Sequence, residues 1–588
     1  MEDLDKILAH PLDTASILRK RKKLTRLLNE QAAGFPVKRI AILGGSTTDE
    51  FQNLLELFLL HAGFRATFYT SEFGLYFEEA AFENPALAAF KPELIYLHTT
   101  VKNLNRQNGI DAESQRWEQI WSGLKAYACP IVQNNFDFPG ERPLGNLDGI
   151  LPGGQTHFVR AMNQRFAEHA QVLPELVIQD IHYLSARIGL DRWIDRKLWY
   201  AYKYAVSYEG MVHLGFHLAS IIRGIFGRSK KGLVLDLDNT CWGGVIGEDG
   251  LDGIHLGEDD ALGEAHRDLQ AYAKALSERG IALAVASKND EANAREGFTH
   301  PDTVLTQKDF AAFLANWDPK HENILAISQQ LNLSPDAFVF LDDDAMERDL
   351  VSTQLPMVDV PDAGDDIATY IDHLDRNGYF EVSSLSEEDT QRGAYYQANQ
   401  ARSELAEAFT DLDTYLASLD MVAEIDHWQD VYLDRITQLT NKTNQFNLTT
   451  QRFNREEMAA IAIDKDALTL YGRLKDTFGD NGLVSVVAGR IVRDELHVFL
   501  WLMSCRVLKR GMEFAMRDVL IEQAQARGLK KIIGEYRESA KNQRVENLYA
   551  DLGFHHLEKR DDGATWVYDL EGEHATLNQN IKVVPYGI

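Results

Sequence analysis

The feature that most constrains this chain is a series of short apolar runs near its middle, each of which ends in polar residues. The run at 232–236 continues into Asp-Leu-Asp-Asn-Thr, the run at 281–286 is followed by Ser287, and the run at 338–341 leads into three aspartates. Helical patterns separate these runs, at 262–278 and 321–331. Strands that alternate with helices predict a parallel, doubly wound α/β sheet, with the polar residues gathered at its carboxyl edge.

The residue types at these strand ends are those that phosphoryl transfer needs. Asp236 and Asp238 can hold a hard cation on oxygen while one carboxylate attacks phosphorus and the other handles the proton. The hydroxyl of Ser287 and the ammonium of Lys320 can bind phosphoryl oxygens, and a further carboxylate, Asp342, can complete a Mg²⁺ site. The competing interpretation is that Asp238 and Ser287 only cap helices.

The four-part series resembles the haloacid dehalogenase superfamily of aspartate-nucleophile phosphotransferases. The resemblance implies that Asp236 is the nucleophile and Asp238 the general acid/base, and that Ser287 and Lys320 hold phosphate. It also implies metal ligands among four aspartates: Asp236, Asp238, Asp342 and Asp343. We therefore expect a phosphatase or phosphotransferase domain at 229–375.

The spacing within this domain limits what can cover the site. A strand-to-strand crossover takes up roughly 30 of the residues between Asp238 and Ser287, which leaves about 20. That length allows a hairpin flap at 242–256 but no folded cap domain. We expect a site that is open to a large partner, such as a phosphopantetheine arm on a carrier protein, as well as to a small phosphate ester.

The first 228 residues show the same alternation of strands and helices. Strands are expected at 39–43, 93–98 and 130–133, and the first ends in Gly-Gly-Ser46-Thr-Thr. This turn resembles the nucleophile turn of SGNH hydrolases and implies an SGNH-like, flavodoxin-type α/β domain at 1–228. Three asparagines can supply an oxyanion donor: Asn103, Asn134 and Asn135. The histidines of this region lack the aspartate three residues before them that the family pattern requires, so the favoured interpretation is that Ser46 caps the following helix.

Residues 376–410 are polar and predict a helical linker. Beyond it, at 411–588, two alternating strands at 483–491 and 495–505 precede a helix at 512–527, which predicts an α+β domain. Between the second strand and the helix, backbone N–H groups can hold pyrophosphate.

This last segment resembles the Gcn5-related N-acetyltransferase (GNAT) fold, although Lys509 replaces the first glycine of that family's loop. The resemblance implies that acyl-pantetheine, on a carrier protein or on coenzyme A, is bound by five residues: Arg506, Arg510, Gly511, Asn542 and Tyr549.

Four segments together resemble the FkbH-like family, namely 236–250, 440–447, 478–482 and 503–507. What this resemblance implies is Mg²⁺-dependent glyceryl transfer. 1,3-Bisphosphoglycerate supplies the acyl group, phosphate is removed, and glycerate is delivered as a thioester to an acyl carrier protein for secondary metabolite or surface polysaccharide synthesis.

Cys505 is the candidate carrier of the glyceryl group. Positive charge from Arg506 and Arg510 beside a helix start favours a reactive thiolate. The alternative is a buried apolar cysteine within a strand, which is the interpretation adopted for Cys129.

The length and composition of the chain limit its number of domains, its binding partners and its location in the cell. A chain of 588 residues is too long for one core, since domains typically hold roughly 100 to 200 residues. Its net charge of −29 repels nucleic acid and anionic membranes, so recruitment would rest on local basic patches such as 19–23 or on Arg506 and Arg510. Three cysteines without a CxxC pair, and no long apolar segment or signal peptide, lead us to expect a cytoplasmic enzyme without a membrane span.

Two other functions remain open from the sequence alone. The first is a plain phosphatase whose flanking domains only recognise a carrier protein or a glycan. The second is an inactive multidomain scaffold, against which the intact central series argues.

Overall fold

The computed structural model describes residues 4–385, 411–443, 445–504, 507–539, 541–560 and 562–585, together with residues 395, 398, 399, 402, 405 and 409. The chain forms two compact units, one of Met1–Ser229 with Asp372–Ser383, the other of Lys230–Ile371 with Ser384–Ile588. The finer division into three domains and a linker stays a prediction. No helix of the described residues is long and apolar enough to cross a bilayer.

The N-terminal unit is built on a parallel sheet with the order β2-β1-β3-β4-β5. Its strands are β1 (Val37–Gly44), β2 (Arg65–Thr70), β3 (Leu94–His98), β4 (Ile131–Asn134) and β5 (Leu176–Gln179). The three predicted strands are confirmed, since β1, β3 and β4 carry the apolar runs. The edge strands β2 and β5 were not predicted. Both are only partly buried, and β2 is also more polar than the inner strands.

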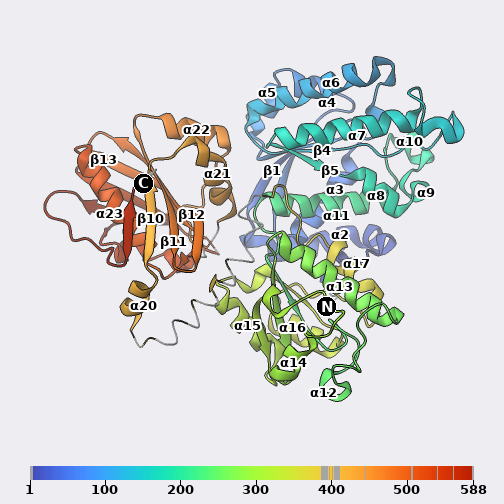
Figure 1. Ribbon diagram of the computed structural model, residues 1–588. Coiled ribbons are helices and arrows are strands. Elements are labelled where there is room, and N and C mark those ends of the chain that lie inside the picture. Colours follow the sequence, from blue (N-terminus) through green and yellow to red (C-terminus); the bar gives the residue numbers. More distant parts are fainter. Residues whose placement is uncertain are drawn as a thin grey trace. The chain divides into compact units, whose positions relative to one another are not determined.

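Helices cover both faces of this sheet, as Figure 1 shows. One core holds side chains of α2 (Thr14–Gln31), α3 (Asp49–His61) and α11 (Tyr208–Ile225). The opposite core holds side chains of α4 (Tyr76–Ala81), α6 (Gly109–Leu124) and α7 (Gln155–Val172). Shorter helices of this unit are α1 (Leu4–Leu8), α5 (Pro85–Phe90), α8 (Ile181–Ile188), α9 (Leu190–Trp193) and α10 (Arg196–Tyr202), and most of α17 (Tyr370–Arg376) belongs to it as well.

The second unit contains a smaller parallel sheet with the order β8-β7-β6-β9. Its strands are β6 (Gly232–Leu235), β7 (Ala282–Ser287), β8 (Phe310–Ala315) and β9 (Phe338–Leu341). Its helices are α12 (Ile246–Asp249), α13 (Ala261–Glu278), α14 (Glu291–Gly297), α15 (Lys320–Gln330) and α16 (Ala345–Gln354). Ile324 and Ile327 of α15 pack with Val351 of α16 on one face of the sheet. The predicted doubly wound α/β class is confirmed.

The C-terminal part holds an eight-stranded mixed sheet with the order β15-β16-β14-β13-β12-β11-β10-β17. Its strands are β10 (Met421–Asp426), β11 (Ala467–Asp476), β12 (Gly479–Val492), β13 (Glu495–Met503), β14 (Lys531–Arg537), β15 (His555–Arg560), β16 (Gly563–Asp569) and β17 (Ile581–Val584). Its helices are α20 (Leu412–Ser418), α21 (Leu433–Lys442), α22 (Arg455–Ile463), α23 (Met512–Ala526) and α24 (Leu548–Asp551).

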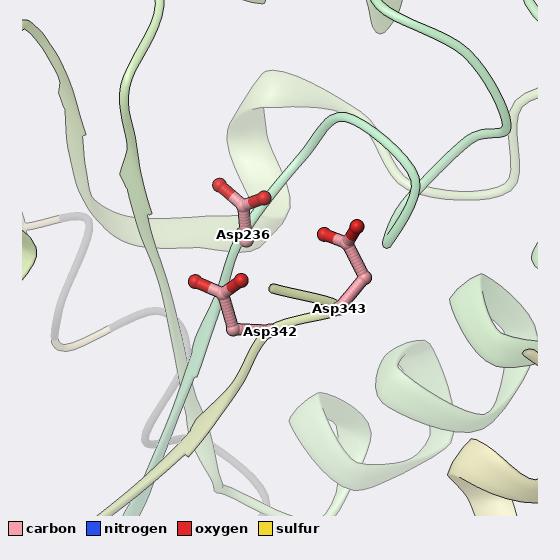
Figure 2. A group of neighbouring side chains, drawn as sticks. All are labelled: Asp236, Asp342 and Asp343. Carbon is pink, nitrogen blue, oxygen red and sulfur yellow. The ribbon is translucent and has the colours of Figure 1, made fainter. Parts of the chain in front are cut away.

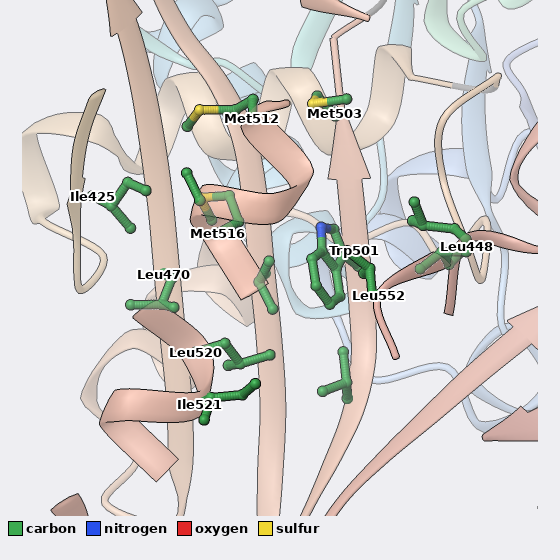
Figure 3. Packing of buried hydrophobic residues seen from close by; sticks show 14 of the residues in the cluster. Ile425, Leu448, Leu470, Trp501, Met503, Met512, Met516, Leu520, Ile521 and Leu552 are labelled. Atoms are coloured by element: carbon green, nitrogen blue, oxygen red, sulfur yellow. The ribbon is translucent and has the colours of Figure 1, made fainter. Parts of the chain in front are cut away.

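A core lies on each face of this mixed sheet. Met512, Met516 and Leu520 of α23 pack against Leu470 and Trp501 of the strands (Figure 3). On the other face, apolar residues of α21 and α22 pack against β11, β12 and β13. Mostly antiparallel strands covered by helices give the α+β character that the sequence predicted.

Candidate active site

Three aspartates meet where two neighbouring strands end. Asp236 directly follows β6, and Asp342 and Asp343 directly follow β9. The two strands are parallel and in register at Leu235 and Leu341, so both chains leave the sheet at the same edge. One carboxylate oxygen from each aspartate lies within 4.8 Å of the others (Figure 2). Because β6 is flanked by β7 and β9, this edge is also the point where the strand order reverses, the usual ligand position in such sheets.

Lys320, the first residue of α15, balances this negative charge. Its side chain is about 5% exposed, and Nζ lies 3.0 Å from Asp236 Oδ1 and 2.6 Å from Asp342 Oδ2. Burial alone would lower the pKa of Lys320, but the two carboxylates outweigh burial and raise it, so the side chain stays an ammonium. Burial and the Asp236 charge raise the pKa of Asp342, and they raise that of Asp343 to about 6.

The acidic group fits a divalent cation. Asp236 Oδ1 is buried and accepts no well-aligned hydrogen bond from the described residues, although the Lys320 ammonium is near. Asp342 Oδ1 accepts the backbone N–H of Asp344 at 2.9 Å, which fixes the turn after β9. Carboxylate oxygens gathered at one point are the ligands that Mg²⁺ prefers.

Asp238 was expected among the metal ligands, but the structure does not bring its carboxylate into this group. The carboxylate turns towards the flap instead, where Oδ1 accepts from Trp242 Nε1 at 2.9 Å and from Ile246 N at 3.1 Å. Its Oδ2 accepts from Asn289 Nδ2 at 3.0 Å. Burial raises the pKa of Asp238, while the two flap donors oppose that shift. A carboxyl group held in this way is oriented for proton transfer.

The flap itself is closed by backbone pairing between Gly243 and His255, with N···O distances of 3.0 and 2.8 Å. Its entry needs a left-handed residue, Asn239, at φ 55°. Sequence reasoning placed the flap correctly but missed Trp242 and Asn289 as contacts of Asp238. Asn289 stands two residues after Ser287, and that proximity to a strand end was the available signal.

Ser287 is the last residue of β7 and is buried at the same edge of the sheet. Its carbonyl accepts the N–H of Asn316 at 3.1 Å, which joins the ends of β7 and β8. The structure therefore brings Asp236, Ser287 and Lys320 to one side of the sheet, as the strand pattern predicted.

A doubly wound sheet with these carboxylates and a buried lysine at its switch point defines a phosphatase domain of the haloacid dehalogenase type. The N-terminal part of the protein BF1531 from Bacteroides fragilis, described as containing a phosphatase domain complexed with Mg, is 26% identical and aligns with a TM-score of 0.59. The match covers 62% of this chain and 99% of that one. No protein-family model matches the sequence, and no curated protein does.

Acetyltransferase structures match a shorter stretch. The ribosomal-protein-S18-alanine N-acetyltransferase of Escherichia coli is 16% identical, with a TM-score of 0.21, over 27% of this chain and 100% of its own. The PaiA N-acetyltransferase of Thermoplasma acidophilum, in complex with coenzyme A, is 10% identical with a TM-score of 0.21, over 25% of this chain and 98% of its own.

The residues expected to bind acyl-pantetheine are engaged within the protein where they are described. Arg510 is buried and donates to Asp476 Oδ2 at 3.0 Å and to Asn399 Oδ1 at 2.7 Å. Gly511 has φ 78° and is the N-cap residue of α23.

Asn542 and Tyr549 are also buried. Asn542 Nδ2 donates to Asn447 O at 2.9 Å and to Arg537 O at 2.8 Å. The Tyr549 ring packs on Trp501 and Phe554, with a buried hydroxyl that lacks a partner among the described residues. Cys505 and Arg506 lie outside the described residues.

The structure corrects the favoured interpretation of Ser46. Thr48, not Ser46, is the N-cap residue of α3, and it makes no side-chain capping bond. The Ser46 hydroxyl is buried and has no hydrogen-bond partner among the described residues. Ser46 therefore does not cap the helix. The expected SGNH relationship stays a prediction.

Proposed function

We propose that this chain is a Mg²⁺-dependent phosphotransferase in which Asp236 attacks phosphorus. The observation that carries the proposal is the buried arrangement of Lys320 between Asp236 and Asp342. An ammonium at this position can bind phosphoryl oxygens beside the carboxylate that attacks phosphorus.

The proposed reaction has two balanced steps. An Asp236 oxygen forms a bond to phosphorus while the bond to the leaving oxygen breaks, and Asp238 donates a proton to that oxygen. Asp238 then takes a proton from water, the water oxygen bonds to phosphorus, and the Asp236–phosphorus bond breaks to release phosphate. Trp242 and Asn289 hold Asp238 in place for both transfers.

The acidic group would hold Mg²⁺ through Asp236, Asp342 and Asp343. A cation there supplies positive charge to the phosphoryl oxygens as negative charge builds up on them. Ser287, buried at the same edge, is the proposed hydrogen-bond donor to a phosphoryl oxygen.

The finer proposal is glyceryl transfer, with 1,3-bisphosphoglycerate as donor and an acyl carrier protein as acceptor. It is supported by the FkbH-like motifs of the sequence. In this proposal the Asp236 site first hydrolyses the 3-phosphate ester and releases inorganic phosphate. The Cys505 thiolate then attacks the acyl carbon and displaces the acyl phosphate. The carrier's thiol finally loses its proton and displaces the Cys505 thiolate to give the glyceryl thioester.

The test is to incubate the full chain with freshly made 1,3-bisphosphoglycerate, Mg²⁺ and a panel of carrier proteins, and to follow phosphate release and intact protein mass. Asp236→Asn should stop release of the 3-phosphate and therefore loading, whereas Cys505→Ala should stop loading and leave release of the 3-phosphate intact. Asp344→Asn is the matched control, because Asp344 caps α16 outside the acidic group and asparagine caps equally well. Loading by both variants would refute the glyceryl mechanism, and release of the 3-phosphate by Asp236→Asn would refute the phosphotransfer mechanism.

A plain phosphatase is the second candidate, because Arg510, Asn542 and Tyr549 are engaged inside the protein rather than arranged around an open cofactor site. It predicts phosphate release with no acylated protein at any time. Mg²⁺-dependent turnover of any phosphate ester would rule out an inactive scaffold.

A further inference from the structure

The N-terminal unit has a ligand-binding edge of its own. Its strand order β2-β1-β3-β4-β5 reverses between β1 and β3. Open parallel sheets bind ligands outside the carboxyl ends of the strands at such a switch point. The segments that follow β1 and β3 are therefore where a ligand of this unit is expected.

One buried hydroxyl lies at this point without a partner. Ser46 comes two residues after the end of β1 and is 3% exposed, and its Oγ meets no hydrogen-bonding group of the described residues. A buried hydroxyl without a hydrogen-bond partner destabilises the folded protein. Asn103 Nδ2 donates to Gly45 O at 3.0 Å, and Gly45 N donates to His98 O at 3.0 Å, so the turn joins the segments after β1 and β3. The turn thus presents a hydroxyl that the described part of the protein does not use.

The backbone of the turn at Gly45 lies directly against the Asn103 side chain. A Cβ on Gly45 would lie 2.2 Å from the Asn103 side-chain nitrogen, so no larger residue fits there without displacing Asn103. The two segments are therefore packed against each other, and the position of Ser46 between them is fixed.

Two lysines flank the same turn. Lys102 directly precedes Asn103, and the Lys203 carbonyl accepts the N–H of Thr47 at 3.2 Å. Their ammonium groups lie 4.4 and 5.4 Å from the centre of the half-buried Trp199 ring. Neither lysine forms an ion pair with a carboxylate of the described residues. Two ammonium groups at one ring repel each other, and a bound anion would relieve that repulsion.

The acidic residues that open α3, next to the turn, are already engaged. Glu50 accepts from Arg21 at 2.5 Å, and the Tyr204 hydroxyl binds Asp49. A further carboxylate, the buried Asp137, accepts from Val101 N at 2.9 Å and from Trp193 Nε1 at 2.9 Å; burial raises its pKa, and the charge of Lys102 helps to oppose that shift. None of these carboxylates forms an ion pair with Lys102 or Lys203.

We propose that this edge of the N-terminal sheet binds a small organic anion, a carboxylate or a phosphate ester. Its charged group is bound by Lys102 and Lys203, a polar atom hydrogen-bonds to Ser46, and the body of the ligand lies along Trp199. The site is on a different sheet from the acidic group, and the proposal does not depend on phosphotransfer.

The probe is 3-phosphoglycerate, which carries both anionic groups, titrated calorimetrically into the full chain in EDTA. Parallel titrations with inorganic phosphate and with glycerate identify which group is recognised. Binding to the native chain should weaken as salt is raised. The double variant Lys102→Gln/Lys203→Gln and the single variant Ser46→Ala should each lose affinity by about tenfold or more.

Three controls separate this site from other causes. Ser46→Ala should unfold at the same temperature as the native chain or higher, because the hydroxyl it removes has no partner. Lys22→Gln removes an exposed lysine of the same unit, and Lys320→Met disables the acidic site; neither should change the affinity. Three results would each overturn the proposal: failure of all three probes to bind, native affinity in the Ser46 or the lysine variant, or loss of binding in Lys320→Met.

Discussion

Replacing Lys320 with methionine is the most direct test of the charge balance in the acidic site. The change keeps an unbranched side chain of similar length but removes the ammonium that lies 3.0 Å from Asp236 and 2.6 Å from Asp342. Two buried carboxylates would then share the site with Asp343 and no cation. Removing one partner from a buried ion pair typically costs about 3–5 kcal/mol.

Protonation sets an upper limit on this cost. A carboxyl group that cannot stay ionised takes up a proton, and holding an aspartic acid neutral at pH 7, about 3 units above its ordinary pKa of about 3.9, costs about 4 kcal/mol. At pH 5 the same calculation gives about 1.5 kcal/mol. The folded variant binds more protons than the unfolded chain, so its stability falls as pH rises from 4 to 7.

The assay is thermal and urea unfolding in EDTA at pH 5 and pH 7. The variant should melt roughly 10 °C below the native chain at pH 7, with a clearly smaller difference at pH 5. Added Mg²⁺ should restore about 2.7 kcal/mol at a hundredfold excess over its dissociation constant, because it replaces the lost positive charge. Phosphate release should nevertheless stay low, since the phosphate-binding ammonium is gone.

Lys288→Met is the matched control. Lys288 follows Ser287 and pairs with Glu347 at 2.6 Å, but its side chain is 39% exposed, so its loss should cost less than about 1 kcal/mol. If Lys320→Met is no less stable than Lys288→Met in EDTA, or if its deficit grows towards pH 5, the reasoning from buried charge is wrong.

Three further outcomes follow from other sites. Asp476→Asn should destabilise the C-terminal part by about 3 kcal/mol or more in urea unfolding, because the buried Asp476 binds two guanidinium groups, those of Arg402 and Arg510. Burial lowers the pKa of His98 to about 4, so its contribution to the free energy of unfolding is complete above pH 6.5 and is lost as pH falls. Hydrogen exchange of β3 should show a loss of about 2 kcal/mol in the free energy of unfolding between pH 7 and pH 5. His98→Gln should abolish this dependence on pH. Trp242→Phe removes one donor to Asp238 and should lower kcat about tenfold with little change in KM, which steady-state kinetics on a phosphate ester can check.

The fold was predictable where strands are buried on both faces. The runs that form β6, β7 and β9 are almost purely apolar and lie between helices. The sequence therefore predicts both that they are strands and the order in which strands and helices alternate. β8, with the sequence Phe-Ala-Ala-Phe-Leu-Ala, was missed because short alanine-rich runs favour helix as readily as strand. The outer strands β15 and β17 were missed for another reason. β15 is polar and exposed along its whole length, and β17 has only four residues, of which two are exposed, so pairing with their neighbours makes them strands.

The candidate site was predictable to the extent that it follows strand ends. Asp236, Ser287 and Asp342 each stand at or next to the last residue of a parallel strand, and register alone brings them to one edge. The direction in which Asp238 points depends instead on the path of the flap, which places Trp242 and Ile246 as donors. No rule of residue spacing predicts the path of the flap, so the expected role of Asp238 as a metal ligand could not be checked before the structure.

The two parallel sheets obey the same rule of ligand placement but differ in what their switch points offer. In the second unit, carboxylates surround one buried ammonium. The carboxylates repel an anionic phosphoryl group, so such a group binds more tightly when a divalent cation occupies the same site. In the N-terminal unit, an unpartnered hydroxyl lies near two lysines without ion pairs, which favours an anion directly and requires no metal. Chelation should therefore separate the two: EDTA should remove anion binding at the acidic group and leave it intact beside Ser46. A chain with a net charge of −29 can bind anions only through such local reversals of charge, because its overall field opposes them.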